Sequence, residues 1–194
     1  PTGYGDSPYQ PFSAFAGNPM LISLEALRDE GLLEAADLAE RPPFSPDRVD
    51  YGAVIEHKER LLRRAYARLR DAGPGHLRAA WEAYTRENAH WLDDFALFMA
   101  LKGEFGWAPW VAWPGEIALR REGAVADWAE RLADEAAYRR FLQFVFDRQW
   151  GRLHARATEL GIAILGDMPI FVGHDSADVW AHRDLYYLDE RGMP

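Results

Sequence analysis

An aspartate that directly follows a short apolar run is the strongest candidate for chemistry in this sequence. Residues 162–166 read Ile-Ala-Ile-Leu-Gly, and Asp167 comes next. Five residues are too few for a helix, and because they are continuously apolar we expect a strand buried on both faces of a parallel sheet. Active sites of β/α enzymes lie at the carboxyl ends of such strands, so Asp167 is predicted to lie at an active-site mouth.

Three polar residues soon after this aspartate could be read as ligands of a divalent cation: His174, Asp175 and Asp178. They all fall within five residues of one loop, whereas structural zinc takes four ligands from separated positions. We therefore favour a polar loop in which Asp175 or Ser176 begins a helical turn. The sequence predicts neither a metal site nor a bound cofactor.

Three tryptophans at i, i+3 spacing, Trp107, Trp110 and Trp113, lie in a segment with two prolines. The prolines exclude a regular helix here. Exposed rings in such a row could bind the apolar faces of sugars, and buried rings could fill the underside of a loop. We favour packing over a carbohydrate-binding platform.

Helical patterns occupy most of the chain between its two ends. The apolar spacing predicts three helical stretches, which are residues 50–71 with Asp50 as the N-cap, residues 76–102 with a break near Asn88, and residues 123–160, which close at Gly161. One solitary strand cannot form a parallel sheet, so the remaining strands must come from elsewhere. The fold class predicted from the residues is α/β, in a chain that is itself predominantly α-helical with few short strands.

The first twenty residues are predicted to be an ordered loop. Glycines and prolines interrupt any regular element there, and the interspersed aromatic residues are too apolar for a flexible linker. From Asn18, the run Pro-Met-Leu-Ile-Ser-Leu at 19–24 could form a short strand or bridge, followed by about two turns of helix that stop at Gly31.

The composition excludes several classes of protein. The 194 residues are 48% hydrophobic and 13% aromatic, enough for a sizeable core in one or at most two domains. A formal net charge of -9 disfavours nucleic acid as a partner. There is no cysteine, no apolar run near the roughly 18 residues that span a membrane, and no signal-peptide pattern, so we expect a soluble cytoplasmic protein. Because the chain opens on proline, it is expected to be part of a longer protein.

Two long stretches of the chain match one known family. The stretches PTGYGDSPYQPFSAFAGNP at 1–19 and GDMPIFVGHDSADVWAHRDLYYLDERGMP at 166–194 resemble the amylomaltases, the 4-α-glucanotransferases of glycoside hydrolase family 77. Residues 48–51, 91–98 and 141–151 between them are also similar to that family, so the resemblance covers the whole chain.

The resemblance implies a (β/α)8 barrel with a mostly helical inserted subdomain. Residues 1–30 would be a substrate-cradle loop of the barrel, residues 31–122 the inserted subdomain, and residues 123–194 a barrel helix, strand and active-site loop. The first barrel strands would be missing from this chain. Its partners would be the remainder of the barrel and its substrates, α-1,4-glucan and maltooligosaccharides, with no nucleic acid and no membrane.

The resemblance also implies a reaction. Glucan segments would be transferred with retention by a carboxylate nucleophile and a carboxyl acid/base in a double displacement. The family's motifs for these two groups do not occur in this chain and are expected beyond Pro194, so the isolated 194 residues are expected to be inactive.

Five residues match the family's substrate site. Tyr9 matches the tyrosine that stacks on the sugar at the cleavage point, and its alternative is a core aromatic residue that fixes a proline-rich loop. Asp167 matches an aspartate beneath the active site, and its alternative is a structural acid that caps the loop. Tyr4, Ser7 and Gln10 are further candidates for glucan contact, although such polar groups also satisfy their own loop backbone.

Two hypotheses therefore remain from the sequence. The first is the amino-terminal part of a 4-α-glucanotransferase. The second is a non-catalytic helical domain that binds glycans or another protein. The solitary strand favours the first hypothesis, because its hydrogen-bonding edges and apolar faces would be exposed to solvent in an independent domain.

Overall fold

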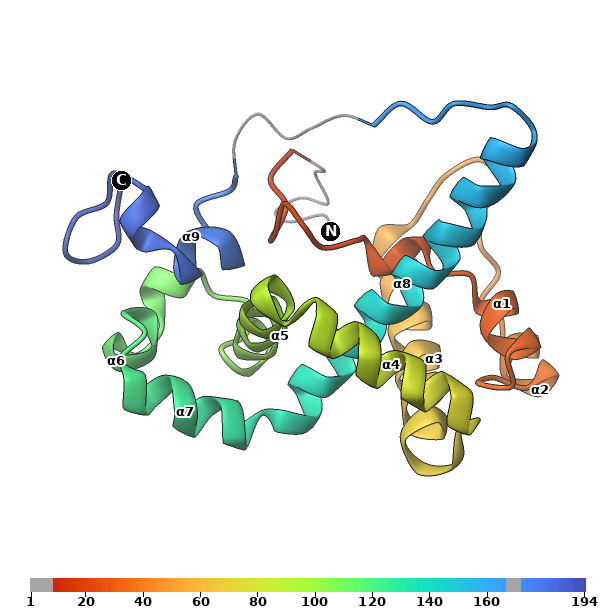
Figure 1. Cartoon of the computed structure of the whole chain (residues 1–194), viewed down its shortest axis with the longest axis horizontal. Helices are drawn as coiled ribbons and strands as arrows, with labels where there is room; N and C mark the ends of the chain where they lie inside the picture. Colours follow the sequence, from red (N-terminus) through yellow and green to blue (C-terminus); the bar gives the residue numbers. More distant parts are fainter. Residues whose placement is uncertain (1–8, 167–171) are drawn as a thin grey trace. The chain divides into compact units, whose positions relative to one another are not determined.

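The computed structural model describes residues 9–166 and 172–194, which form helices joined by loops (Figure 1). The predicted predominance of helix is confirmed. The chain divides into two compact units. The first unit comprises the described residues of 1–17, 87–140 and 165–194, and the second comprises residues 18–86 and 141–164.

The second unit contains all or most of six elements. They are the 3-10 helix η2 (Pro19–Leu21) and the α-helices α1 (Leu24–Asp29), α2 (Ala35–Ala39), α3 (Tyr51–Ala72), α4 (Gly75–Glu87) and α8 (Ala133–Glu159), whose first residues belong to the first unit. The apolar faces of α3 and α8 supply the core, with buried side chains at Leu61, Leu62, Ala65, Leu69, Phe141, Leu142, Phe144 and Val145. Each fully buried side chain of this size contributes about 1.5–3 kcal/mol.

Local signals account for the ends of these helices. The Asp50 carboxylate accepts a hydrogen bond from the backbone N–H of Ala53 at 3.1 Å, so the predicted N-cap of α3 is confirmed. The predicted break near Asn88 is also confirmed, because α4 ends at Glu87 and α5 (Ala89–Glu104) begins after it. Gly31, with φ of +77°, follows α1 as expected.

The first unit is built around α5. Consecutive residues from Phe95 to Lys102 are all buried, which is the pattern of a helix surrounded by protein on every side. The rings of Phe98, Trp113 and Trp180 pack on one another with centroids 5.4–5.9 Å apart. The remaining elements of this unit are η3 (Trp110–Ala112), α6 (Gly115–Ala118), α7 (Glu122–Arg131), α9 (Ala177–Ala181) and η4 (Arg183–Leu185).

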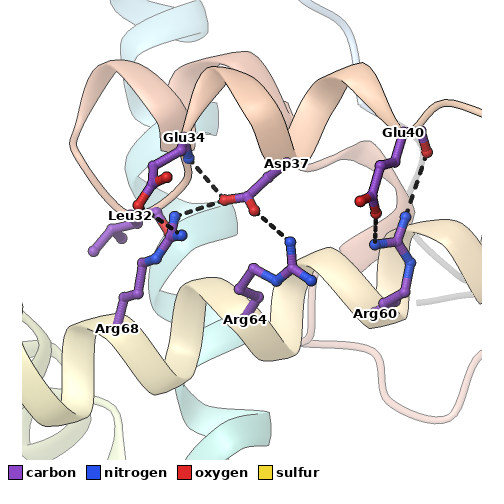
Figure 2. A network of polar contacts seen from close by, with 7 residues as sticks. All are labelled: Leu32, Glu34, Asp37, Glu40, Arg60, Arg64 and Arg68. Atoms are coloured by element: carbon purple, nitrogen blue, oxygen red, sulfur yellow. Dashed lines mark hydrogen bonds and ion pairs between the residues drawn. The ribbon is translucent and has the colours of Figure 1, made fainter.

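A row of arginines on α3 binds α2 and the residues beside it (Figure 2). Asp37 on α2, whose side chain is 6% exposed, accepts hydrogen bonds from Arg64 and, at 2.6 Å, from Arg68. It also accepts one from the backbone N–H of Glu34 at 2.8 Å. Burial alone would raise the pKa of the Asp37 carboxyl, but the hydrogen bonds outweigh this and hold its pKa below the usual value.

The strand predicted for residues 162–166 is wrong. These residues form no strand in the structure, and the Leu165 side chain is 94% exposed. The backbone N–H of Ile162 bonds back to the carbonyl of Ala157 at the end of α8. A strand requires a neighbour with which to pair, and no segment of the described chain hydrogen-bonds alongside these residues.

Two smaller predictions also differ from the structure. The short strand or bridge predicted for residues 19–24 does not form, and the run begins instead with η2, which Asn18 caps by accepting a hydrogen bond from the N–H of Met20. The single helical stretch over 123–160 is divided at Leu132 into α7 and α8. Because the break contains neither glycine nor proline, the sequence carries no local signal for it.

No helix among residues 9–166 and 172–194 is long and apolar enough to cross a membrane. The (β/α)8 barrel and the division at residues 30 and 122 remain predictions.

Replacing Asp37 with asparagine should lower the free energy of unfolding by about 1–3 kcal/mol, because the arginines lose their buried carboxylate partner. Urea unfolding measures this change. The matched control is Glu40→Gln, since Glu40 pairs with Arg60 while 68% exposed and should contribute at most about 0.5 kcal/mol. Equal losses in both variants would contradict this account of Asp37.

The contribution of Asp37 should also depend on pH. Since its pKa is lowered in the folded state, the unfolded chain takes up a proton first as the pH falls below about 4. The stabilisation is therefore complete above that pH and disappears as the pH falls through the folded-state pKa. A difference between the native protein and Asp37→Asn that stays constant down to pH 3 would show that the carboxylate charge is not responsible.

Candidate functional site

Two segments that are distant in sequence lie side by side in the first unit: residues 9–15, called the 9–15 loop, and residues 172–178, called the 172–178 segment. The backbone N–H of Ala177 donates a hydrogen bond to the carbonyl of Phe12 at 2.8 Å. Gly173 lies so near the loop that a Cβ there would be 3.4 Å from a loop carbonyl oxygen. The two segments are therefore in van der Waals contact at this position.

A half-buried carboxylate strengthens this contact. Asp178 accepts hydrogen bonds from the backbone N–H of Ala14 at 2.7 Å and from the hydroxyl of Ser13 at 3.4 Å. The Ser13 hydroxyl oxygen in turn accepts one from the N–H of Phe15 at 3.1 Å. Burial raises the pKa of the Asp178 carboxyl, and the two hydrogen bonds offset part of that rise.

A buried lysine lies beneath both segments. The Lys102 side chain is 2% exposed, and its ammonium donates to the carbonyl oxygens of Trp107 at 2.9 Å and Ala108 at 3.0 Å. Its third hydrogen bond goes to Oδ2 of Asp175 at 2.6 Å. All three ammonium donors are therefore satisfied. Nζ also lies 5.2 Å from the ring centre of Phe12, at cation–π distance.

The second carboxylate oxygen of Asp175 also accepts a hydrogen bond. Oδ1 of Asp175 accepts a hydrogen bond from the backbone N–H of Trp110 at 3.1 Å, and the indole N–H of Trp110 donates to the carbonyl of His174 at 2.8 Å. Nε2 of His174 lies 2.7 Å from the carbonyl oxygen of Gly192. Gly192 has φ of +81° and lies so close to the Trp110 ring that a Cβ would overlap it.

The predicted substrate residues divide into two groups. Tyr9 and Gln10 lie at the start of the 9–15 loop and are exposed. The Tyr9 side chain is 69% exposed, so the alternative that it is a core aromatic residue is wrong. Tyr4, Ser7 and Asp167 lie outside the described residues, and their roles stay predictions.

The predicted packing of the tryptophans is confirmed for two of the three. Trp110 is fully buried and Trp113 is 4% exposed, so neither ring offers a face to a sugar. Trp107 is 53% exposed and packs beside Phe12, with ring centroids 6.1 Å apart. The tryptophan segment therefore packs against the protein and does not form a three-ring platform.

The polar loop predicted after Asp167 is confirmed in its described part. Ser176 caps α9 by accepting a hydrogen bond from the N–H of Val179 at 3.2 Å. Asp175 and Asp178 bind separate partners, on α5 and on the 9–15 loop. Among the residues that the structure describes, no three His, Asp or Glu side chains are grouped so that they could hold a metal ion.

Comparisons with known proteins agree with one another. The sequence model of glycoside hydrolase family 77, described as 4-alpha-glucanotransferase, matches residues 1–194. The 4-alpha-glucanotransferase of Thermus thermophilus is 48% identical over 194 residues, which are 100% of this chain and 38% of the relative. That of Synechocystis sp. is 43% identical over 189 residues, which are 97% of this chain and 37% of the relative.

A solved structure shows the same likeness. The amylomaltase from Streptococcus agalactiae in complex with acarbose matches with a TM-score of 0.93 and 34% identity, covering 100% of this chain and 39% of that one. The chain belongs to glycoside hydrolase family 77, the 4-alpha-glucanotransferases. It spans less than two fifths of the length of the Thermus thermophilus and Synechocystis relatives, at 38% and 37%.

Sequence reasoning missed the residues that join the two segments. Lys102 carries one signal, since it follows Phe95, Phe98 and Met99 at the i+7, i+4 and i+3 spacing of a buried helical face. Asp178 was considered only as a metal ligand. Its bonds to the 9–15 loop are long-range, and a single sequence contains no pattern that predicts them.

Replacing Asp178 with alanine should free the N–H of Ala14 and speed its hydrogen exchange, with a loss of stability of about 1–3 kcal/mol. Asp178→Asn should have a smaller effect, because its amide oxygen can still accept one hydrogen bond. The measurement is amide exchange followed at Ala14 by NMR. Unchanged exchange in the alanine variant would show that Asp178 does not hold the loop.

Proposed function

We propose that the protein containing this chain is an amylomaltase that transfers α-1,4-glucan segments between maltooligosaccharides. The observation that carries the proposal is the exposed Tyr9 ring on a loop bonded to the segment that follows Asp167, in a chain of this family. The complex of the Streptococcus agalactiae amylomaltase with acarbose supports an oligosaccharide ligand.

The proposed chemistry is a retaining double displacement. One carboxylate attacks the anomeric carbon, and a second carboxyl protonates the leaving oxygen and later deprotonates the incoming sugar hydroxyl. In retaining enzymes the two groups stand about 5–5.5 Å apart. We assign both groups to the part of the protein outside these 194 residues, and accordingly expect the isolated chain to be inactive. The greater length of the relatives supports this assignment.

The residues of this chain would then bind and orient the glucan. The flat ring of Tyr9 suits stacking on the apolar face of a glucose. Asp167 would orient neighbouring groups beneath the cut sugar. Gln10 and Ser7 have hydrogen-bonding reach to sugar hydroxyls, and Tyr4 would add a further contact.

The same proposal includes the architecture. Residues 1–30 form the substrate-cradle loop of a (β/α)8 barrel, residues 31–122 the inserted helical subdomain, and residues 123–194 a barrel helix and active-site loop. The likeness to an amylomaltase structure over the whole chain supports a fold shared with that enzyme. We also place the protein in the cytoplasm, as expected from its sequence.

In the full-length protein, Tyr9→Ala should lower kcat/KM for maltotriose disproportionation about tenfold through lost stacking. Asp167→Asn should lower it by about a hundredfold, because the charge network beneath the cut sugar is altered. Release of glucose and longer maltooligosaccharides measures both.

The control is Tyr187→Ala, since Tyr187 is fully exposed and belongs to neither segment. It should keep the parental rate. Parental rates in both Tyr9→Ala and Asp167→Asn would show that these site assignments are wrong, and a full-length protein that leaves maltotriose unchanged would refute the function itself.

A further inference from the structure

We propose that Lys102 is a positioning residue of the glucan site, whose buried ammonium holds the 9–15 loop and the 172–178 segment in the arrangement that glucan transfer requires. The proposal rests on the proposed function and adds a residue that touches no sugar. Lys102 would act through Phe12 on the loop that carries Tyr9, and through Asp175 on the segment that follows Asp167.

The burial of this lysine needs an explanation other than stability. Lysine is almost never fully buried, and removing its charge from water costs several kcal/mol unless partners compensate. An apolar side chain of similar length would fill the same space among the aromatic rings without that cost. Buried ion pairs add little net stability, and in some proteins they specify one arrangement of the chain. The position of Lys102 under two site segments fits that second role.

The geometry fixes the ammonium from three directions. The two carbonyl oxygens, of Trp107 and Ala108, come from the turn that follows α5, so this turn defines where Nζ lies. The third acceptor, Oδ2 of Asp175, is at 2.6 Å and belongs to the 172–178 segment. The segment is thereby placed relative to α5, whose residues from Phe95 to Lys102 are all buried.

If the Asp175 carboxylate rotated away from the ammonium, it would lose a second hydrogen bond as well. Its other oxygen already accepts the backbone N–H of Trp110 at 3.1 Å. Asp175 lies eight residues after Asp167, and Phe12, whose ring faces Nζ at 5.2 Å, lies three residues after Tyr9. One ammonium therefore contacts the loop that carries Tyr9 and the segment that follows Asp167.

The test uses the full-length protein with Lys102→Met, an apolar side chain of similar length. We expect kcat/KM for maltotriose to fall about 30-fold, with most of the loss in kcat, because displaced groups no longer fit the transition state. Asp37→Asn is the matched control, since it also breaks a buried ion pair but lies in the second unit. Assayed well below its melting temperature, it should keep kcat/KM within about twofold of the parental value.

A double-mutant cycle separates positioning from general destabilisation. In the Tyr9→Ala background, Lys102→Met should cost only about three- to tenfold, because the part of its effect that passes through Tyr9 is already gone while the part that passes through Asp175 remains. The same 30-fold loss in both backgrounds would overturn the proposal.

If Lys102→Met does not fold, the variant K102M/D175N replaces it throughout the cycle, since it removes both charges and leaves none buried alone. This variant should fold and should have a lowered kcat/KM for maltotriose. A folded double variant with parental kcat/KM would overturn the proposal, while maltotriose activity in the parental protein would keep the proposed function intact.

Discussion

A positive charge buried in an apolar unit constrains everything around it. The Lys102 ammonium is stable at 2% exposure only because three oxygen acceptors surround it, two from the backbone and one from the Asp175 side chain, and the segments that supply them must then stay in place. The turn after α5 supplies two of them and the 172–178 segment supplies the third. The 9–15 loop is bound to this segment in turn through Phe12 and Asp178. The hydrogen bonds of one buried ammonium thus position the segments around the candidate site.

The second unit uses the same physical solution with the opposite charge. There the buried group is the Asp37 carboxylate, and two arginines of α3 with one backbone N–H supply its donors. In both units an apolar and aromatic core provides most of the burial, but such contacts are non-directional. The buried charges add direction, because a charge-assisted hydrogen bond is favourable only within a narrow range of distance and angle.

The sequence predicted what depends on neighbouring residues. Asp50 as an N-cap, the break at Asn88 and the helical turn after Ser176 all follow from short-range patterns, and the structure confirms them. The strand at 162–166 was wrong because a strand depends on a partner, which local sequence does not reveal. The partners of Asp178 and Lys102 could not be predicted for the same reason, since the residues that they bind are up to 165 positions away.

The most direct measurement of the central claim is a crystal structure of the full-length protein with a bound maltooligosaccharide. Our account predicts a glucose ring stacked on Tyr9 at contact distance, about 4 Å, with Asp167 beneath the same sugar and the Lys102 to Asp175 ion pair intact. A glucan bound in the catalytic barrel with neither Tyr9 nor Asp167 near it would contradict the account.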